Sequence, residues 1–251
     1  MPKVSVIVPT YNRAELIGLT IESILKQTFA DFELIVINDG STDGTEETIK
    51  KYTDPRIKYY RKDNGGESSA RNYGLRMAQG EFIAYCDSDD IFCPDHLAAL
   101  VAALEKDPHF AVAYGDAKVV TAKGSSVSNF AGRKSPEKDF FFSPPPSNIL
   151  HRRECLDKAG LFDEAPALVP GGADWDMWLR LIRHYKFIHV PKVLTEYHIH
   201  AECMTRTGNR TLIMLGTRFY VINKRFKERQ KAQGLLMAFL ATLPEWLKIL
   251  S

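Results

Sequence analysis

Three carboxylates lie close together directly after a short apolar run. The run 81–86 is followed by Asp87, Ser88, Asp89 and Asp90. Carboxylates this close repel one another, and their pKa values rise unless a cation neutralises them. Mg²⁺ or Mn²⁺ suits such a group, because hard divalent ions prefer oxygen ligands and are usually shared with substrate phosphates. The spacing predicts a metal and phosphate site, although a D-x-D alone also occurs by chance in many loops.

Other acids follow other apolar runs. Asp39 and Asp63 come after two of them, and Asp174 opens an apolar helical stretch. Ligands of an open parallel sheet bind beyond the carboxyl ends of its strands, so acids that end successive strands are expected to share one site. A single aspartate in such a place is more often a turn former or a helix cap. For Asp174, a cap and a catalytic base are both open from its position alone.

The elements that must position these acids alternate along the first half of the chain. Short β-branched runs predict strands at 3–9, 32–38, 56–61 and 81–86. Helices are predicted from near Asn12, with Glu15 three residues on, from around 43–46, over 67–79, and from Pro94. Strands that alternate with helices predict an α/β fold with a mostly parallel sheet covered on both faces.

The second half of the chain has a different pattern. Residues 121–146 are rich in Gly, Ser and Pro and predict a loop or an extended connection. A helix near 151–159, a strongly apolar helix over 174–183 and a β-like run to His200 follow. The tail 206–251 is basic and then apolar, which fits either a helix on an anionic membrane surface or a helix packed on protein.

Composition limits the class of protein. The chain has 251 residues, 45% of them hydrophobic and 25% charged, which excludes collagen-like, disordered and disulfide-scaffold chains. A net charge of +2 is too small for nucleic-acid binding by bulk charge. Four cysteines without CxxC spacing predict reduced thiols, and neither a signal peptide nor an apolar stretch of membrane-spanning length is visible. A cytoplasmic protein is expected, with peripheral contact at the inner membrane face through the tail as a further expectation.

Five segments, taken in order, resemble the signatures of family 2 glycosyltransferases of the inverting GT-A type. They are VSVIVPTYNR (4–13), VINDGSTDGT (36–45), DNGGESSARNYGL (63–75), EFIAYCDSDD (81–90) and GGADWDMWLRL (171–181). Neither a dinucleotide G-x-G-x-x-G after the first strand nor a P-loop occurs in the chain. The resemblance covers about the first 200 residues. It implies a Rossmann-like nucleotide-sugar half at 1–120, an acceptor half at 121–205 and an appended helical tail at 206–251.

The resemblance also implies roles for the residues at the strand ends. Pro9, Thr10 and Tyr11 would hold the nucleobase, and Asp39 would accept a hydrogen bond from the base imide, which favours uracil or thymine. Asp63, Arg71 and Ser88 would line the nucleotide pocket, Arg71 being suited to a phosphate or to orienting Asp39. A surface salt bridge is the plainer role for Arg71. The cation, Mn²⁺ or Mg²⁺, would be held by Asp87, Asp89 and His200, with Asp89 as a direct ligand and Asp87 facing the ribose or a metal-bound water. Of the three acids, Asp90 is assigned least firmly.

The segment around Asp174 departs from the family pattern. Ala173 stands where the family usually has Glu, and His198 stands where it has Arg, which leaves acceptor specificity open. Asp174 matches the catalytic base, and Asp176 is expected to face the acceptor or to be structural. Residues 146–148 resemble an acceptor-side segment. A zinc site of His198, His200 and Cys203 is a weak alternative, because no fourth ligand is evident.

The resemblance implies a single in-line displacement on a nucleotide-diphosphate sugar. The acceptor would be a glycan or a lipid-linked sugar, as in cell-surface polysaccharide or glycolipid synthesis. The flexible 121–146 segment and the turn at Gly171 are candidates for a lid. Two alternatives are a sugar nucleotidyltransferase, which would carry a Gly-rich phosphate loop where this chain has PTYNR, and a scaffold that binds a sugar nucleotide without catalysis.

Overall fold

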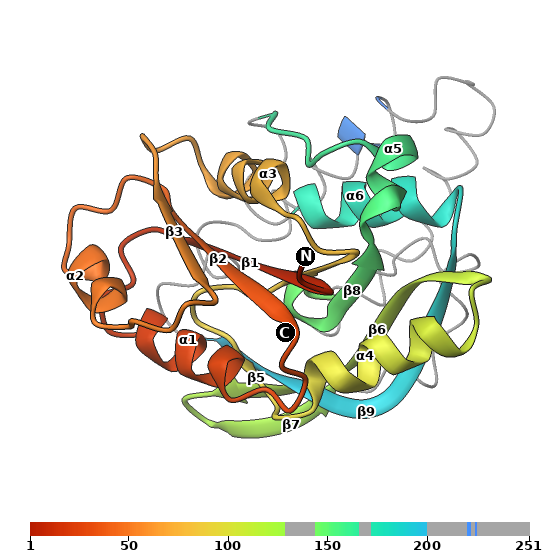
Figure 1. The fold of residues 1–251 in the computed structure, drawn as a ribbon, viewed down its shortest axis with the longest axis horizontal. Coiled ribbons are helices and arrows are strands. Elements are labelled where there is room, and N and C mark those ends of the chain that lie inside the picture. Colours follow the sequence, from red (N-terminus) through yellow and green to blue (C-terminus); the bar gives the residue numbers. More distant parts are fainter. Residues whose placement is uncertain (129–143, 166–171, 200–219, 222–223, 225–251) are drawn as a thin grey trace.

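The computed structural model describes residues 1–128, 144–165, 172–199, 220–221 and 224 (Figure 1). The strands are β1 (Val4–Thr10), β2 (Phe32–Asn38), β3 (Ile57–Arg61), β4 (Phe82–Tyr85), β5 (Ile91–Phe92), β6 (Phe110–Thr121), β7 (Gly124–Ser128), β8 (Ile149–Arg152) and β9 (Lys186–Ile199). The helices are α1 (Ile17–Leu25), α2 (Thr45–Lys50), α3 (Glu67–Met77), α4 (His96–Lys106), α5 (Leu156–Ala159) and α6 (Ala173–Ile182), with 3₁₀ turns at Pro146–Asn148 and Arg153–Cys155.

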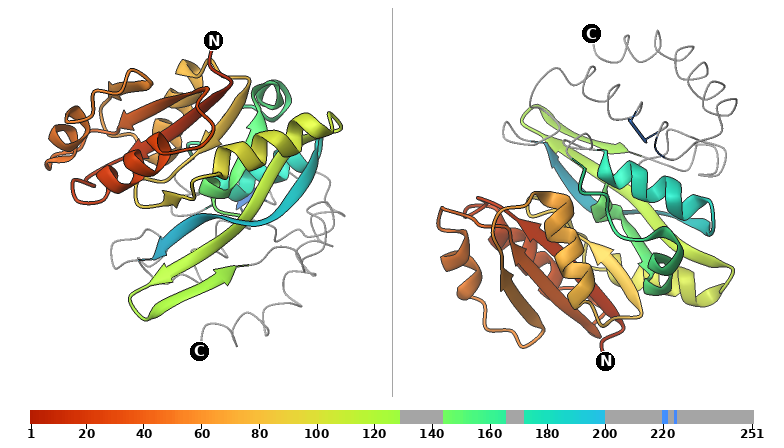
Figure 2. Two further views of the ribbon diagram at one scale, coloured as in Figure 1. Left: turned by 60° about the horizontal axis from the view of Figure 1, so that its bottom comes forward. Right: turned by 90° about the horizontal axis from the view of Figure 1, so that it is seen from above.

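One sheet runs through the molecule in the order β3-β2-β1-β4-β8-β6-β9-β5, with β7 paired to β6. Strands β3, β2, β1 and β4 are parallel neighbours, and β6 and β9 form a long parallel pair that Figure 2 shows crossing the C-terminal half. Strand β8 is antiparallel to both β4 and β6. The α/β class is therefore confirmed, while the expectation of a mostly parallel sheet holds only for the N-terminal half.

The antiparallel β8 has a local cause. The preceding turn Pro146–Asn148 lies at the carboxyl end of β4, where Ser147 Oγ accepts a hydrogen bond from the Asp87 amide at 3.0 Å. A strand that starts at this end of the sheet must run back along β4. The predicted helix near 151–159 is consequently wrong at its start, because residues 149–152 form β8 and α5 begins only at Leu156.

Alternating side chains of the strands build two cores, one on each face. Val6 and Val8 of β1 pack on the side covered by α1, α2 and α4, whereas Ile7 packs on the side covered by α3, α5 and α6 (Figure 1). All three valine and isoleucine side chains are fully buried. Burial on both faces explains the near-continuous apolar runs of β1 and β2.

Helix α3 lies very close to the sheet. A Cβ on Gly74 would come 2.6 Å from Cγ2 of Ile7, so only glycine permits this approach. The helix starts after Gly66, whose φ of 86° suits glycine. The N-terminal part of α3 thereby places Arg71 beside Asp87, just after the carboxyl end of β4.

Two further sequence expectations change in detail. Helix α1 begins at Ile17 rather than near Asn12, which has φ 51° and accepts a hydrogen bond from the Thr42 amide at 2.8 Å. Asn12 thus ties two loops together instead of capping the helix. Part of the predicted loop 121–146 is the β6–β7 hairpin, and the rest of the proposed lid, 129–143 and Gly171, lies outside the described residues.

Most of the tail also lies outside the described residues, so its two interpretations stay open. Within the part of the chain that the structure describes, no helix combines the length and the apolar character needed to cross a bilayer. Cys86, Cys93 and Cys155 are free thiols there, as expected, and Cys203 is not among the described residues.

Candidate active site

The predicted acids meet at one edge of the sheet because β1, β2, β3 and β4 are parallel and end together. Thr10 ends β1, Asp39 follows β2, Asp63 follows β3 and Asp87 follows β4. The backbone confirms the proximity, since the Asp39 amide donates to the Thr10 carbonyl at 2.9 Å. Helices α3 and α6 add Arg71 and Asp174, which interact electrostatically with Asp87.

Asp39 sits in a ring of donors. Its Oδ1 accepts hydrogen bonds from Lys62 Nζ at 2.6 Å and from the Gly65 amide at 3.1 Å, and its Oδ2 accepts one from the Gly66 amide at 2.8 Å. Lys62 Nζ also donates to the Asp63 carbonyl at 2.6 Å. Asp63 therefore contributes its backbone carbonyl to this subsite, and the residue as a whole is exposed to solvent. Lys62 was not predicted as a site residue. The available signal was its position in the sequence next to Asp63, after a predicted strand.

The β1 end offers a lining for a flat ligand. Pro9 and Thr10 are buried, whereas Tyr11 is 45% exposed and presents its ring at the surface. Thr10 Oγ1 is buried and has no hydrogen-bond partner among the described residues. A buried hydroxyl without a partner is costly unless a water or a ligand satisfies it, so this atom marks a polar position at the subsite.

Arg71 links the carboxylates of a second subsite, at the carboxyl end of β4. Its Nη2 contacts Glu67 Oε1 and lies 2.6 Å from Asp87 Oδ1, and its guanidinium lies over the ring of Phe162 at 5.4 Å from the ring centre. The side chain is 3% exposed, so the plainer role of a surface salt bridge is wrong. Its hydrogen bonds go to the carboxylates of Glu67 and Asp87, whereas Asp39 is held by Lys62 and by two backbone amides.

Glu67 and Asp174 carry raised pKa values. Burial raises the pKa of Glu67 to about 7; Arg71 opposes this shift, and the charges of Asp87, Asp174 and Asp89 add to it. Burial likewise raises the pKa of Asp174 to about 6, opposed by Arg71 and by the amide of Trp175, which donates to Asp174 Oδ1 at 2.7 Å. These shifts place Glu67 within the cluster, a residue that the sequence interpretation missed. Its position four residues before Arg71 was the available signal.

Asp174 is not the cap of its helix. Gly172 is the residue at the N-cap of α6, and Asp174 lies inside the first turn. A carboxylic acid with a pKa near neutrality is suited to accept and release a proton. Asp176, in contrast, is 1% exposed and pairs with Arg180 Nη2 at 2.9 Å, so it is structural rather than acceptor-facing.

Asp87 and Asp89 fit a shared cation better than an all-protein metal cage. Among the residues that the structure describes, no group of three or more His, Cys, Asp and Glu side chains could hold a metal ion. Two half-buried carboxylates at one strand end match Mg²⁺ or Mn²⁺, which keeps water and substrate phosphate as further ligands. Asp89 lies 4.0 Å from Arg13 Nε. The predicted ligand His200 lies outside the described residues, as does Cys203 of the zinc alternative.

Asp90 and the 146–148 turn form a buried hydrogen-bond network next to the site. Asp90 is fully buried and accepts hydrogen bonds from Ser147 Oγ at 2.5 Å and from the His198 amide at 3.1 Å. Burial raises its pKa well above the ordinary value. Ser147 and Asn148 are fully buried, so the expectation that this segment lines an acceptor pocket is wrong for these side chains. Ser88 is buried as well, at 8% exposure, between Asp87 and Asp89.

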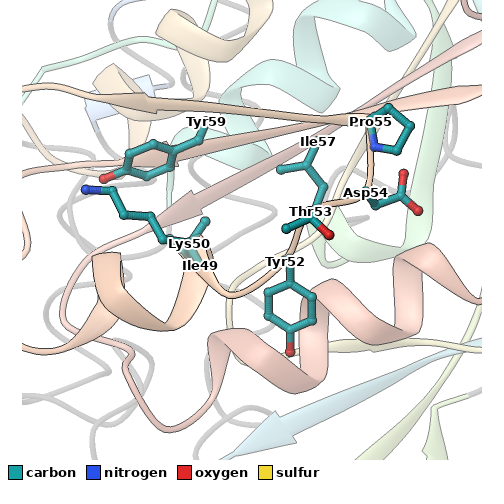
Figure 3. Close-up of a pocket in the computed structure, with 8 residues that line it drawn as sticks. All are labelled: Ile49, Lys50, Tyr52, Thr53, Asp54, Pro55, Ile57 and Tyr59. Carbon is teal, nitrogen blue, oxygen red and sulfur yellow. The ribbon is translucent and has the colours of Figure 1, made fainter.

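A surface hollow lies elsewhere, beside the edge strand β3 (Figure 3). Its lining includes Lys50, Tyr52 and Asp54, and none of the predicted site residues. The polar groups of the hollow are satisfied within the protein: Lys50 pairs with Glu46, Tyr52 donates to the Gly18 carbonyl, and Asp54 pairs with Arg56. The hollow has no cluster of reactive groups and is separate from the carboxylate site.

Known proteins resemble this chain over most of its length. The sequence profile of Glycosyl transferase family 2 matches residues 5–159. An uncharacterized glycosyltransferase of Rickettsia felis is 31% identical over 217 residues, which are 80% of this chain and 35% of that protein. Chondroitin synthase of Pasteurella multocida is 33% identical over 205 residues, covering 80% of this chain and 21% of that protein. The chain thus spans only a minor part of these two relatives.

A solved structure resembles the fold. Residues 1–349 of TarS from S. aureus, in complex with UDP-GlcNAc, align with a TM-score of 0.74 at 25% identity, over 95% of this chain and 71% of that chain. A complex of the same TarS fragment with UDP aligns with a TM-score of 0.72. The likeness confirms the predicted fold class, including its GT-A type.

Proposed function

Because this chain belongs to glycosyl transferase family 2, we propose that it transfers a sugar from a nucleotide-diphosphate sugar to an acceptor hydroxyl and inverts the anomeric carbon. One observation carries the proposal. Asp174, with its pKa near 6, and the acids Asp87 and Asp89 belong to one electrostatic cluster at the carboxyl edge of the sheet. A base and a diphosphate site side by side are the two parts that a single in-line displacement requires.

Asp174 is the proposed general base. It takes the proton from the acceptor hydroxyl as the oxygen attacks the anomeric carbon, where the transition state has oxocarbenium character. The raised pKa supports this role, because a carboxylate with pKa near the working pH accepts a proton more readily than an ordinary aspartate. One attack on the face opposite the leaving group gives inversion.

The leaving nucleotide occupies the strand ends of β1, β2 and β4 in this proposal. Pro9, Thr10 and Tyr11 hold the base, and Asp39 with Lys62 reads its polar edge, which favours uracil or thymine. Asp63 and Ser88 line the same pocket. The UDP and UDP-GlcNAc complexes of the similar TarS structure support a uridine nucleotide.

Asp87 and Asp89 would hold a divalent cation, Mn²⁺ or Mg²⁺, together with the diphosphate and water. When bound, the cation stabilises the negative charge that grows on the leaving diphosphate, so no general acid is needed on that side. Arg71 adds a buried positive charge beside Asp87. His200 keeps its assignment as a third ligand from the C-terminal side.

The acceptor is proposed to be a glycan or a lipid-linked sugar. The chondroitin synthase relative supports a saccharide acceptor and a role in polysaccharide synthesis. Action in the cytoplasm, with peripheral contact at the inner membrane face through the tail 206–251, is part of the same proposal. No nucleic-acid partner is proposed.

Two other functions are less well supported. A non-catalytic sugar-nucleotide scaffold would not need the raised pKa of Asp174, because binding alone favours satisfied carboxylates. A sugar nucleotidyltransferase would need a phosphate loop after β1, where the described chain has the tight link from Asn12 to residues 41–42.

Nucleotide binding is the first test. Thermal unfolding of the full chain is measured with UDP, dTDP, GDP and CDP, each with and without Mn²⁺. A ligand at ~100 times its Kd stabilises the folded state by about 2.7 kcal/mol, so a cation-dependent rise selective for one nucleotide is expected. Release of that nucleotide from its sugar donor in the presence of saccharide acceptors then separates the enzyme from the scaffold. Absence of any shift would contradict the proposed function.

A further inference from the structure

Glu67 has no role in the proposed chemistry, yet it lies inside the site. It is the first residue of α3, four residues before Arg71, and its Oε1 contacts Arg71 Nη2. The same nitrogen lies 2.6 Å from Asp87 Oδ1. One guanidinium nitrogen therefore serves two carboxylates that come from different elements, one from α3 and one from the end of β4.

Because both carboxylates share one nitrogen, another hydrogen-bond donor of the Arg71 guanidinium has no partner. Its Nε is buried and has no hydrogen-bond partner within the described part of the chain. A guanidinium has five N–H donors and can hold two carboxylates on separate edges. Glu67 and Asp87 instead meet at Nη2, an arrangement in which either carboxylate can leave while the other stays.

Asp87 is the carboxylate with a reason to leave. In the proposed function it turns to the cation, and it then ceases to neutralise Arg71. The Arg71 side chain is 3% exposed, and a buried charge that loses its partner is strongly destabilising. Glu67, which is 30% exposed and has no assigned ligand, remains beside the guanidinium.

We infer, on the basis of the proposed function, that Glu67 is a positioning residue of the donor site: it retains Arg71 when Asp87 turns to the cation that binds with the nucleotide. Glu67 touches neither the donor nor the cation in this role. It lowers the free energy needed to release Asp87, and it keeps the Arg71 charge beside the diphosphate. Without Glu67, Arg71 would compete with the cation for Asp87.

The inference separates Glu67 from an ordinary helix salt bridge. A pair spaced four residues apart on a helix stabilises the fold slightly and has no effect on ligands. If Glu67 holds Arg71 in place, loss of the Glu67 charge should instead weaken the cation-dependent binding of nucleotide. The ligand-free fold should not weaken, because burial makes the ionised Glu67 unfavourable there and holds its pKa at about 7.

The test uses thermal unfolding of the full chain at pH 8 with the nucleoside diphosphate that stabilises the wild type and a titration of Mn²⁺. We expect Glu67→Gln to raise the Mn²⁺ concentration for half-maximal stabilisation by about tenfold, with no loss of ligand-free stability. Glu67→Asp, which keeps the charge, should recover part of the loss. Glu47→Gln is the matched control, because Glu47 is an exposed glutamate in the first turn of α2.

A double-mutant cycle assigns the effect to Arg71. In an Arg71→Met background the competitor for Asp87 is gone, so Glu67→Gln should cause no further change in the Mn²⁺ titration. Three results would overturn the inference: an unchanged Mn²⁺ titration in Glu67→Gln, the same shift in Glu47→Gln, or a wild-type response to nucleotide that ignores Mn²⁺. A wild type that responds to no nucleotide would instead reject the proposed function itself, and the inference with it.

Discussion

The two ends of the parallel sheet bury carboxylates in opposite ways. Near the amino end of β2, Glu33 is 3% exposed and accepts hydrogen bonds from Ser5 Oγ at 2.5 Å and from the Gln79 amide at 2.8 Å. Lys58 Nζ lies 2.5 Å from its other oxygen. Burial raises the pKa of Glu33, but these partners outweigh burial, and the net pKa is lowered.

At the carboxyl end, Glu67 and Asp174 have fewer partners and raised pKa values of about 7 and about 6. Three carboxylates of the cluster, those of Glu67, Asp87 and Asp174, interact with one buried arginine, Arg71. The negative charge at the amino end is neutralised by groups of the protein itself. The negative charge at the carboxyl end exceeds what the protein neutralises, so a bound cation would balance it. Within one sheet, the carboxylate with a full set of protein partners stabilises the fold, and the carboxylates with too few partners form the candidate site.

Replacement of the base tests the carboxyl end most severely. Asp174→Asn keeps the shape of the side chain and removes its ability to take a proton. We expect the rate of sugar transfer to fall on the order of 10² to 10⁴-fold while nucleotide binding stays nearly intact. Nucleotide release in the presence of acceptor, and nucleotide-dependent thermal stabilisation, measure the two quantities.

The same variant also probes the difference between the two ends. Because the ionised Asp174 is unfavourable in the folded state, the ligand-free Asp174→Asn protein should unfold at pH 8 at the same temperature as the wild type or above it. Equal losses of transfer and of nucleotide binding would reject Asp174 as the base.

Replacement of Glu33 should have the opposite consequences. Glu33→Gln removes a buried charge whose partners Ser5, Lys58 and the Gln79 amide remain in place. We expect a loss of about 1–3 kcal/mol in the free energy of unfolding, with unchanged transfer activity per folded molecule. Urea unfolding followed by activity measurement at low temperature checks both. Reduced activity in a fully folded Glu33→Gln protein would show that the two ends are coupled.

Much of the carboxyl end of the sheet was visible in the sequence. The strands at 32–38 and 81–86 were predicted within one residue at each end, since each is a short β-branched or aromatic run bounded by turn residues. Parallel order then brought Asp39, Asp63 and Asp87 to one edge without further information. The residues Asp174 and Arg71 were placed by motifs whose order along the chain is more specific than any single match.

The missed features depend on side chains that meet across the fold. The spacing of Glu67 and Arg71 was the available signal in the run DNGGESSARN, but it does not reveal the partial burial of Glu67, which follows from the approach of α3 to Ile7 at Gly74. Lys62 acquires its role only when β2 and β3 pair. Only the last two residues of β8 fell in the helix predicted near 151–159, because so short a strand carries no recognisable period. The direction of β8 is set by the contact of Ser147 with Asp87 and Asp90.

The pH dependence should also separate the two ends. A base with a pKa of about 6 in the free enzyme predicts that kcat/KM falls about tenfold per pH unit below that value. The raised pKa values of Glu67 and Asp174 mean that the folded state binds more protons than the unfolded state between about pH 4 and 7, so their contribution to stability falls as the pH rises. Glu33, with its lowered pKa, contributes stability above its unfolded value that is lost as the pH falls through its folded pKa.

Profiles of activity and of unfolding temperature between pH 4 and 9 measure these opposed trends. Asp174→Asn should lose the acid limb of activity, and Glu67→Gln should lose part of the decline in stability toward pH 7. An acid limb that persists unchanged in the residual activity of Asp174→Asn would assign it to another group.

The smallest effect is expected at Asp39, which is the exception at the carboxyl end because it is already surrounded by donors. Lys62 Nζ uses two of its three N–H donors on Asp39 and on the Asp63 carbonyl, which leaves one for a base carbonyl. Lys62→Met should therefore weaken UDP binding by about threefold to tenfold and leave CDP binding, in which an amine replaces the O4 carbonyl, nearly unchanged. Lys51→Met, at an exposed lysine after α2, is the control. Titration of each protein with both nucleotides decides the point: equal losses for UDP and CDP would mean that Lys62 acts on the shared diphosphate, and Asp39 would then read the base without it.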